Sequence, residues 1–315
     1  MKILITGAAG FIGFHLAKEL CEQNYHIIGI DNLNDYYNQN LKKHRLDILN
    51  RYQNFSFYKS DLKALNALNE DFDLAIHLAA QPGVRLPKSM HYKYETYNID
   101  GFNFFLDFCE KRKINKIIYA SSSSVYGNHP IKPFVETLEL LEPVNKYAAS
   151  KMANEVAAKV YQKKHNVNLI GLRFFTVYGP LGRPDMAYFN FAHRIINNEE
   201  IRLFNNGKLK RDMTYIDDIT DGILGAIEYS ANNKVDFQIF NLGNEKPIQT
   251  TYLLNLIEEK LDKNALIKNI NHSKEVKITY ADCAKAFKVF GYSPKVEIED
   301  GISEFIDWYA RYFKI

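Results

Sequence analysis

The regular alternation of apolar, β-rich runs with amphipathic helical segments is the feature that most constrains the fold. Six such runs occur in the first 175 residues, with a helix-like segment between each pair: residues 2–6, 26–31, 55–61, 73–79, 116–121 and 168–175. Successive parallel strands require a long crossover, usually a helix, whereas antiparallel strands can be joined by short turns. The sequence therefore predicts an α/β fold built on a doubly wound parallel sheet.

The second part of the chain is predicted to form a smaller unit. After Thr176 the alternation loosens into strand-like IRLF, QIFNLG and VKITYAD, and into helices near 188–197, 217–229, 250–261 and 299–313. We predict a nucleotide-binding domain over residues 1–175 and a smaller α/β substrate domain mainly over residues 176–315. The two are interleaved, because parts of 213–243 and 276–290 are expected to return to the first domain. A chain of 315 residues is long enough to bury a core for both.

Composition and charge exclude several classes of protein. With 46% hydrophobic and 24% charged residues the chain is globular, and its net charge of +3, without a basic tail, argues against a nucleic-acid partner. No apolar run approaches the ~18 residues of a membrane span, and no signal peptide is recognisable. Cys21, Cys109 and Cys283 lie too far apart for a metal motif or a disulfide framework. We expect a soluble, cytoplasmic protein without a metal or a membrane partner.

A glycine-rich turn follows the first predicted strand. In ITGAAGFIG, Gly7, Gly10 and Gly13 lie between that strand and a helix beginning near Phe11. Glycines there allow a tight turn and a close approach of the backbone to a pyrophosphate, whose charge rests on the helix N-terminus. Asp31 ends the second strand, where an acid binds the adenosine ribose hydroxyls and repels a 2′-phosphate. The pattern favours NAD over NADP, and the alternative is a structural turn with a surface aspartate.

One further acid follows the next strand. Asp61, in KSDL, could face the adenine of the dinucleotide, or it could act only as a helix cap.

Four consecutive serines in ASSSSVYG, residues 120–127, raise the question of a linker or a site. Serine tracts are usually solvated linkers. Here the β-rich run KIIYA precedes them, so they lie at the end of a predicted strand, where open α/β sheets bind ligands. Ser122 is therefore a candidate to contact a substrate hydroxyl.

Tyr147 and Lys151, in NKYAASK, lie one helical turn apart and share a face of a predicted helix. A tyrosine with a pKa near ~10 acts as a base at neutral pH only if its pKa falls by about three units. The Lys151 ammonium and a positively charged nicotinamide ring could lower it. Together with Ser122, the Tyr147 phenol could bracket one substrate hydroxyl. The alternative is a solvated helix face.

In these motifs the chain resembles the extended short-chain dehydrogenase/reductases, and within them the UDP-glucuronate 4-epimerases. The resemblance covers nearly the whole chain and rests on TGAAGFIGFHLAKEL, GIDNLNDYY, HLAAQPGVR, ASSSSVYG, YAASK, GLRFFTVYGPLGRPDM, RDMTYIDDI, FNLGN and FIDWY. It implies a Rossmann-type fold with a nucleotide-sugar domain. It also implies reversible oxidation of carbon 4 of a UDP-sugar by bound NAD, through a 4-keto sugar that is reduced on its other face.

The resemblance also implies roles for individual residues. Tyr147 would be the base, Ser122 and Lys151 its catalytic partners. The resemblance further implies a set of residues that bind NAD. These are Gly7, Gly10, Phe11, Ile12, Gly13, Asp31, Asn32, Asp61, Leu62, Leu78, Ala79, Ala80, Tyr147, Lys151 and Phe174.

The substrate is suggested by positions around the serines and in the second half of the chain. Related dehydratases carry an acid pair directly after the catalytic Ser/Thr, whereas Ser123 and Ser124 stand here, so dehydration lacks its acid. The two serines either contact the hexuronate or pack at the strand end. Thr176 and Arg183 match residues that hold the uronate carboxylate, although Arg183 could instead pair with Asp185 in its loop.

The diphosphate and nucleotide end of the substrate is less completely matched. Arg211 resembles the arginine that meets the diphosphate, and its alternative is a surface pair with Asp212. Arg85 falls where the sequence departs from the family, which leaves its role open. Lys274 and Glu275 replace a Gly-Asp pair that the family usually carries near the nucleotide.

Several alternatives remain open at this point. The chain could epimerise another nucleotide sugar, decarboxylate UDP-glucuronate, or act as a catalytically silent NAD-binding regulator. The resemblance further implies a homodimer, paired through helices near 99–112 and 147–163.

Overall fold

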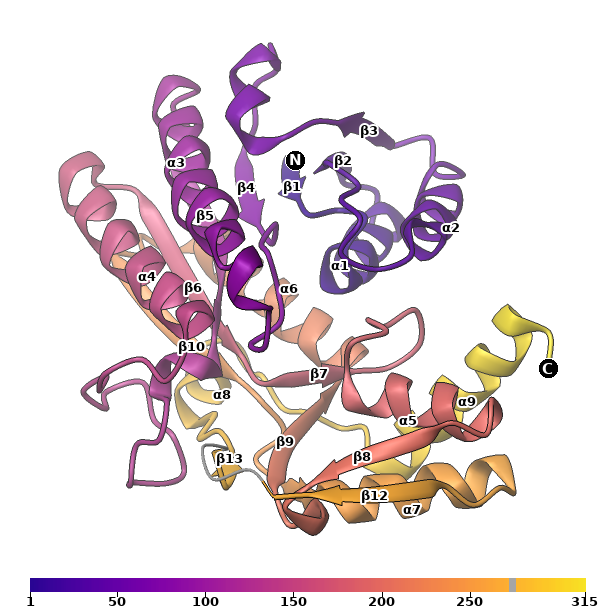
Figure 1. The fold of residues 1–315 in the computed structure, drawn as a ribbon. Helices are drawn as coiled ribbons and strands as arrows, with labels where there is room; N and C mark the ends of the chain where they lie inside the picture. Colours follow the sequence, from indigo (N-terminus) through magenta and orange to yellow (C-terminus); the bar gives the residue numbers. More distant parts are fainter. Residues whose placement is uncertain (272–275) are drawn as a thin grey trace.

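A seven-stranded parallel sheet forms the larger part of the computed structural model, which describes residues 1–271 and 276–315 (Figure 1). Its strand order is β10-β6-β5-β4-β1-β2-β3, and every neighbouring pair is parallel. The order reverses around β1 and β4, as in a doubly wound Rossmann-type sheet. The strands are β1 Lys2–Thr6, β2 His26–Asp31, β3 Phe55–Lys59, β4 Leu74–His77, β5 Lys116–Ser122, β6 Asn168–Phe174 and β10 Phe237–Leu242.

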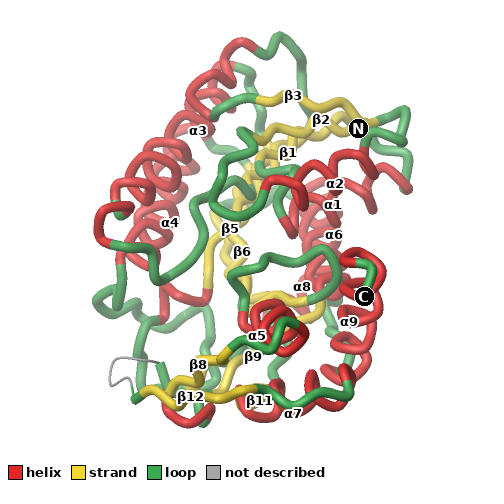
Figure 2. The backbone as a smooth tube through the Cα atoms, turned by 45° about the vertical axis from the view of Figure 1, so that its right-hand side comes forward, coloured by secondary structure: helices red, strands yellow, loops and turns green. Residues whose placement is uncertain are grey.

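Helices cover both faces of this sheet. On one face lie α1 Phe11–Glu22, α2 Gln39–Leu49 and α6 Ile216–Asn232, and on the other lie α3 Gly101–Lys111 and α4 Lys146–His165 (Figure 2). Successive side chains of a strand point to opposite faces, so Ile3 and Ile5 pack toward α1 while Leu4 packs toward α3. The two apolar cores that result make the parallel strands nearly continuous hydrophobic runs.

The smaller part of the molecule follows β6. A four-stranded sheet contains β7 Thr176–Tyr178, β9 Lys210–Tyr215, β11 Pro247–Gln249 and β13 Ile278–Thr279, and β8 Glu200–Phe204 pairs with β12 Leu266–Ile270. Helices α5 Ala187–Ile196, α7 Thr250–Leu261 and α9 Ile298–Phe313 pack around them, whereas α8 Ala284–Phe290 packs on α6 and β10. No helix among the described residues has the length and apolar character to cross a bilayer.

The predicted α/β class and the parallel sheet are confirmed, with local corrections. Strands β1 and β2 have the predicted bounds, while β3 and β4 are shorter because their last residues turn into the loops that carry Asp61 and Ala79. The predicted strand VKITYAD reduces to the two residues of β13 within the described part. Strand β12 was not predicted, because its side chains are almost all exposed and give no buried face. β10 and α8 do pack with the larger sheet, but the division into two domains stays a prediction.

Asp212 on β9 joins three segments of the smaller part. Its carboxylate is fully buried and accepts hydrogen bonds from the backbone N–H groups of Asn244 (2.7 Å), Glu245 (3.0 Å) and Ala281 (2.9 Å). Thr214 donates a fourth hydrogen bond at 3.2 Å. Burial raises the pKa of Asp212, and these donors counteract the rise. The carboxylate therefore replaces the sheet partners that these loops lack.

We predict that Asp212→Ala lowers the free energy of unfolding by on the order of 3 kcal/mol, because three buried N–H groups lose their acceptor. Urea unfolding followed by circular dichroism measures the change. Asp236→Ala, at an exposed aspartate, is the control and should shift stability by less than about 0.5 kcal/mol. Equal stability of the two variants would contradict the role assigned to Asp212.

Candidate active site

One elongated cavity lies along the carboxyl edge of the large sheet. Its walls come from the loops that follow β1, β2, β3, β4, β5 and β6 and from the start of α4. All of the predicted catalytic and NAD-binding residues line it: Gly7, Gly10, Phe11, Ile12, Gly13, Asp31, Asn32, Asp61, Leu62, Leu78, Ala79, Ala80, Ser122, Tyr147, Lys151 and Phe174. Of the predicted substrate residues, Arg183 alone lies among them.

The glycine turn fits a dinucleotide by its lack of side chains. Gly7 has φ +77°, a conformation that L side chains rarely adopt, and a Cβ on it would approach Ala79 N to 2.7 Å. A Cβ on Gly13 would lie 2.1 Å from the Gly7 carbonyl oxygen. Gly10 begins α1 without a side-chain cap, so the first N–H groups of the helix face the cavity. These open N–H groups provide the anion site that a pyrophosphate requires.

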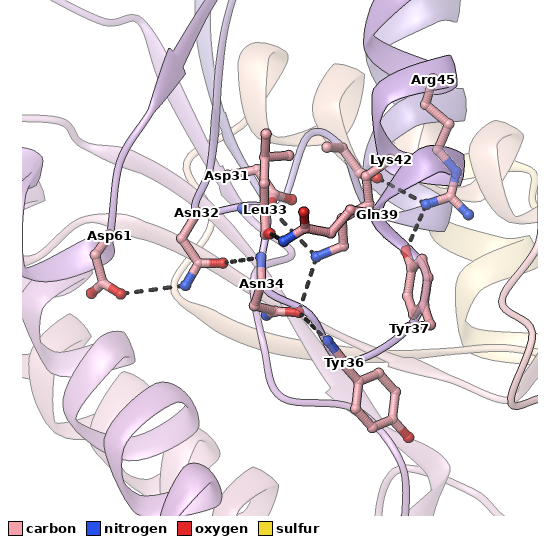
Figure 3. Close-up of polar contacts among 11 residues, drawn as sticks. Asp31, Asn32, Leu33, Asn34, Tyr36, Tyr37, Gln39, Lys42, Arg45 and Asp61 are labelled. Atoms are coloured by element: carbon pink, nitrogen blue, oxygen red, sulfur yellow. Dashed lines mark hydrogen bonds and ion pairs between the residues drawn. The ribbon is translucent and has the colours of Figure 1, made fainter.

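The segment after β2, whose polar contacts are drawn in Figure 3, also lines this cavity. Asp31 is buried, accepts a hydrogen bond from Leu33 N at 2.8 Å, and lies 3.7 Å from Lys42 Nζ. Lys42 also donates to Asn34 Oδ1 at 3.0 Å. Lys42 and Asn34 were missed by the sequence analysis, although they are polar residues within a dozen positions of Asp31. The sequence feature that could have pointed to them is the polar stretch NLNDYYNQNLKK, which follows a predicted strand.

Asp61 acts as the helix cap that was one of its two predicted roles, and the contact with adenine stays a prediction. Its side chain caps the 3-10 helix Leu62–Ala67, accepting from Lys63 N at 3.3 Å, and it accepts from Asn32 Nδ2 at 3.3 Å (Figure 3). It also lines the cavity, next to Leu62. The cap therefore fixes a carboxylate that also lines the cavity.

Ser122, Tyr147 and Lys151 meet in the middle of the cavity. Ser122 is the last residue of β5, and its Oγ accepts a hydrogen bond from Ser124 N at 3.2 Å. Tyr147 and Lys151 lie on the first turns of α4, which Asn145 caps by accepting from Ala148 N at 2.8 Å. Lys151 is buried and donates to the Ala120 carbonyl of β5 at 2.8 Å. This hydrogen bond ties the helix to the strand that carries the serine.

Burial dominates the ionisation of both titratable groups. It lowers the pKa of Lys151 to about 8, although Glu155 one turn further along α4 opposes the shift. Burial raises the pKa of Tyr147, while the Arg183 guanidinium and a hydrogen bond with Ser122 partly counteract the rise. The sequence predicts that the Lys151 ammonium and a nicotinamide ring together lower the pKa of Tyr147. Among the described residues Arg183 and Ser122 lower it, whereas the Lys151 ammonium donates to the Ala120 carbonyl. The combined effect with NAD stays a prediction.

A buried ionic network supports this part of the site. Arg173 donates two hydrogen bonds to Glu155, at 2.8 and 2.7 Å, and Ser121 donates to the same carboxylate at 2.6 Å. The two charged side chains are almost fully buried, which requires such pairing. None of these residues was predicted, because their partners come from β5, β6 and α4 and share no local motif.

The remaining predicted substrate residues lie around the cavity rather than within it. Thr176 and Arg211 line a second, smaller cavity. Arg211 donates to the Val276 carbonyl at 2.8 Å. Arg85 is exposed and lies over the ring of Phe204, 4.5 Å from its centroid. Lys274 and Glu275 lie outside the described residues.

The serines after Ser122 form a 3-10 turn, Ser123–Tyr126, at the end of β5. Ser122 Oγ donates to Ser124 Oγ at 3.1 Å, which agrees with the packing alternative.

Arg183 forms the ion pair with Asp185 that was the alternative to a substrate role. Its Nε and Nη2 donate to the two carboxylate oxygens of Asp185 at 3.0 and 2.5 Å. Its Nη1 has no hydrogen-bond partner among the residues that the structure describes.

The parallel sheet, the side-chain-free glycine turn and the Ser-Tyr-Lys group define an NAD-binding enzyme of the short-chain dehydrogenase/reductase type. Comparison with known proteins supports this class of enzyme. The family model described as "NAD dependent epimerase/dehydratase family" matches residues 3–243. The chain belongs to this family, it is an NAD-dependent epimerase, and the prediction of NAD as its cofactor is confirmed.

Three similar proteins illustrate the relationship. An uncharacterised protein of Methanocaldococcus jannaschii, MJ1055, is 45% identical, over 98% of this chain and 96% of that protein. UDP-glucuronate 4-epimerase 2 of Arabidopsis thaliana is 37% identical, over 100% of this chain and 77% of that one. The crystal structure of a Bacillus cereus UDP-glucuronic acid 4-epimerase with UDP-glucuronic acid and NAD has a TM-score of 0.93 and 34% identity, over 99% and 100% of the two chains.

The lowered pKa of Lys151 predicts a pH dependence of stability in protein freed of NAD. Below about pH 8 the lysine is protonated in both states, and folding carries the full cost of burying its charge. Between pH 8 and the unfolded value of 10.5 the native state holds fewer protons, so the free energy of unfolding rises with pH, by roughly 3 kcal/mol in total. Urea unfolding at several pH values should show this slope in the wild type and not in Lys151→Met. Parallel curves for the two proteins would contradict the burial of a charged Lys151.

Proposed function

We propose that the protein interconverts UDP-glucuronate and UDP-galacturonate, as a UDP-glucuronate 4-epimerase. The observation that carries the proposal is the position of Arg183, a guanidinium with an open Nη1, in the same cavity as Ser122, Tyr147 and Lys151. A guanidinium fork suits a carboxylate and has no comparable partner on a neutral hexose. The resemblance to characterised proteins named for this activity supports it.

The proposed chemistry takes place at carbon 4 of the sugar. NAD, when bound along the glycine turn, supplies the two-electron acceptor and returns the electrons to the same carbon. Tyr147, as phenolate, accepts the proton of the 4-hydroxyl, and Ser122 hydrogen-bonds the same oxygen. Because burial disfavours the phenolate, positive charge near it is required. Arg183 provides part of this charge, and the bound pyridinium ring is expected to provide more.

The 4-keto sugar must then turn its other face before the proton returns. Tyr147 donates the proton back to the oxygen on carbon 4, now in the opposite configuration. Lys151, anchored to Ala120, holds the helix end and the phenol at a fixed distance from the Ser122 hydroxyl. We assign Arg211 to the diphosphate of the UDP group and Thr176 to the uronate. The nucleotide would then extend from the main cavity toward the smaller one that these two residues line.

Holding the carboxylate has a second consequence. A 4-keto uronate is a β-keto acid, which loses carbon dioxide most readily when the bond to the carboxylate stands perpendicular to the ketone plane. A carboxylate fixed by Arg183 away from this angle would be retained, so the epimer and not a pentose is the product. Decarboxylation is thus an outcome that the assay must monitor.

Tyr147→Phe tests the proposed base. We expect a loss of kcat of at least about a hundredfold in the conversion of UDP-glucuronate to UDP-galacturonate, followed by proton NMR. Tyr161→Phe, on the same helix but packed in the core beneath it, is the matched control and should retain activity. Unchanged conversion by Tyr147→Phe would refute the assigned base, and a wild type that converts only UDP-glucose would refute the role of Arg183.

We also propose that the protein forms a homodimer through α3 and α4. Three apolar side chains on these helices are strongly exposed in the single chain: Phe104 at 42%, Val156 at 65% and Val160 at 62%. Val156 and Val160 are four residues apart and share one face of α4. Pairing of two copies would remove this face from water and form a four-helix bundle. The cytoplasmic location stays a prediction.

Light scattering on a size-exclusion column tests the dimer. The wild type should elute with twice the mass of the chain, and Val156→Glu with Val160→Glu should elute as a monomer, because two buried charges would face each other across the axis. Val84→Glu, at an exposed valine on another face, should leave the mass unchanged. A monomeric wild type at micromolar concentration would rule the dimer out.

A further inference from the structure

Residues 179–186 form the loop between β7 and α5, and the backbone carbonyls of its first four residues all accept hydrogen bonds from side chains. Tyr188 donates to Gly179 O at 3.3 Å, and His15 Nε2 to Pro180 O at 3.1 Å. Arg45 donates to the next two: to Leu181 O from Nε (3.1 Å) and Nη2 (2.5 Å), and to Gly182 O from Nη2 (3.0 Å). Loop carbonyls are normally solvated, so an unbroken series of this kind fixes the backbone directly before Arg183.

Arg45 makes the largest contribution to this arrangement. It lies on α2, is fully buried, and also donates to Ala9 O in the glycine turn (2.8 Å) and to the Tyr37 hydroxyl (2.7 Å; Figure 3). All of these acceptors are neutral oxygens. A guanidinium is costly to bury without a carboxylate, so its retention at this position requires several well-formed hydrogen bonds. One side chain thus connects α2, the glycine turn and the loop before Arg183.

The conformation of the loop explains why it needs this support. Leu181 has φ +55°, in the left-handed region that is unfavourable for residues other than glycine. Its carbonyl receives two of the Arg45 hydrogen bonds. Without them the leucine would relax toward ordinary backbone angles, and the chain entering Arg183 would change direction.

A second link reaches Arg183 from the same stretch of chain. The Tyr36 hydroxyl donates to Asp185 Oδ2 at 3.1 Å, and Asp185 holds the Nε and Nη2 edge of Arg183. Burial alone would raise the pKa of Asp185, but Arg183 and these hydrogen bonds lower it, so the carboxylate is charged. With that edge occupied, the guanidinium offers a substrate its other edge, formed by Nη1 and the second N–H of Nη2.

We propose that Arg45 and Tyr36 are positioning residues that set the direction of Arg183 and so determine how firmly the enzyme holds a carboxylate-bearing sugar. This inference rests on the proposed function and names two residues, outside the Ser-Tyr-Lys group, that act through another side chain. The stretch from Asp31 to Arg45 then contributes both to the predicted cofactor site and to the loop that carries Arg183. Asp31, Asn34, Lys42 and the two tyrosines line the cavity, and Tyr36 and Arg45 also contact the segment that carries Arg183.

The experiment compares Arg45→Met and Tyr36→Phe with matched controls in the NAD-loaded full chain. Arg112→Met removes an arginine that donates to the carbonyl of Leu68, and Tyr58→Phe removes a tyrosine that donates to Glu70 at 3.0 Å. Neither residue lines the cavity. The first measurement is amide hydrogen exchange of residues 179–186. Arg45→Met should speed exchange there by about tenfold or more, with the control unchanged. Unaltered exchange would overturn the inference even if UDP-glucuronate were not the substrate.

The second measurement separates positioning from general loss of structure. For Arg45→Met, KM for UDP-glucuronate should rise about tenfold, and for Tyr36→Phe about threefold, while the inhibition constant of UDP-glucose changes less than about twofold. Equal weakening of the two ligands, or none, would overturn the role of Arg45 and Tyr36. Failure of the wild type to turn over UDP-glucuronate would instead refute the proposed function, and the exchange measurement would still decide the positioning of the loop.

Discussion

The parallel register of the seven strands is the constraint on which the site depends. Because all strands run in one direction, their carboxyl ends meet at one edge, and the loops after β1 to β6 contribute to the same cavity. The glycine turn follows β1, Asp31 ends β2, Asp61 follows β3, and Ser122 ends β5. The pairing of parallel strands therefore brings residues more than a hundred positions apart to the same edge of the sheet.

Burial then creates the chemical problem that the site must solve. It disfavours both the Tyr147 phenolate and the Lys151 ammonium, since each is a charge in a medium of low dielectric constant. The surroundings of the two groups oppose this effect to different extents. Glu155, itself paired with Arg173, favours the charged lysine, and Arg183 favours the phenolate. The proposed carboxylate site and the proposed base are thus electrostatically linked, because Arg183 would act on both.

Local patterns predicted much of the fold and the centre of the site. The bounds of β1 and β2 and the lining positions of Gly7, Asp31 and Tyr147 follow from short-range rules on periodicity, glycine turns and helix faces. Contacts that depend on distant segments were not predictable. Arg45 reaches a loop 136 residues away, and its own helix shows only one arginine among polar residues. The hydrogen bond from Lys151 to the Ala120 carbonyl was not predictable for a similar reason, since it joins a helix to a strand 31 residues earlier in the chain.

The central claim is that one carbon of the sugar is oxidised and reduced again inside a single cavity. The most direct measurement uses UDP-glucuronate with deuterium on carbon 4, converted in ordinary water by protein with a full complement of NAD. The account predicts that the UDP-galacturonate formed retains its deuterium on carbon 4, because that atom is removed to NAD and returned without meeting water. Loss of the label to solvent would mean that carbon 4 is inverted by proton exchange, and it would contradict the account.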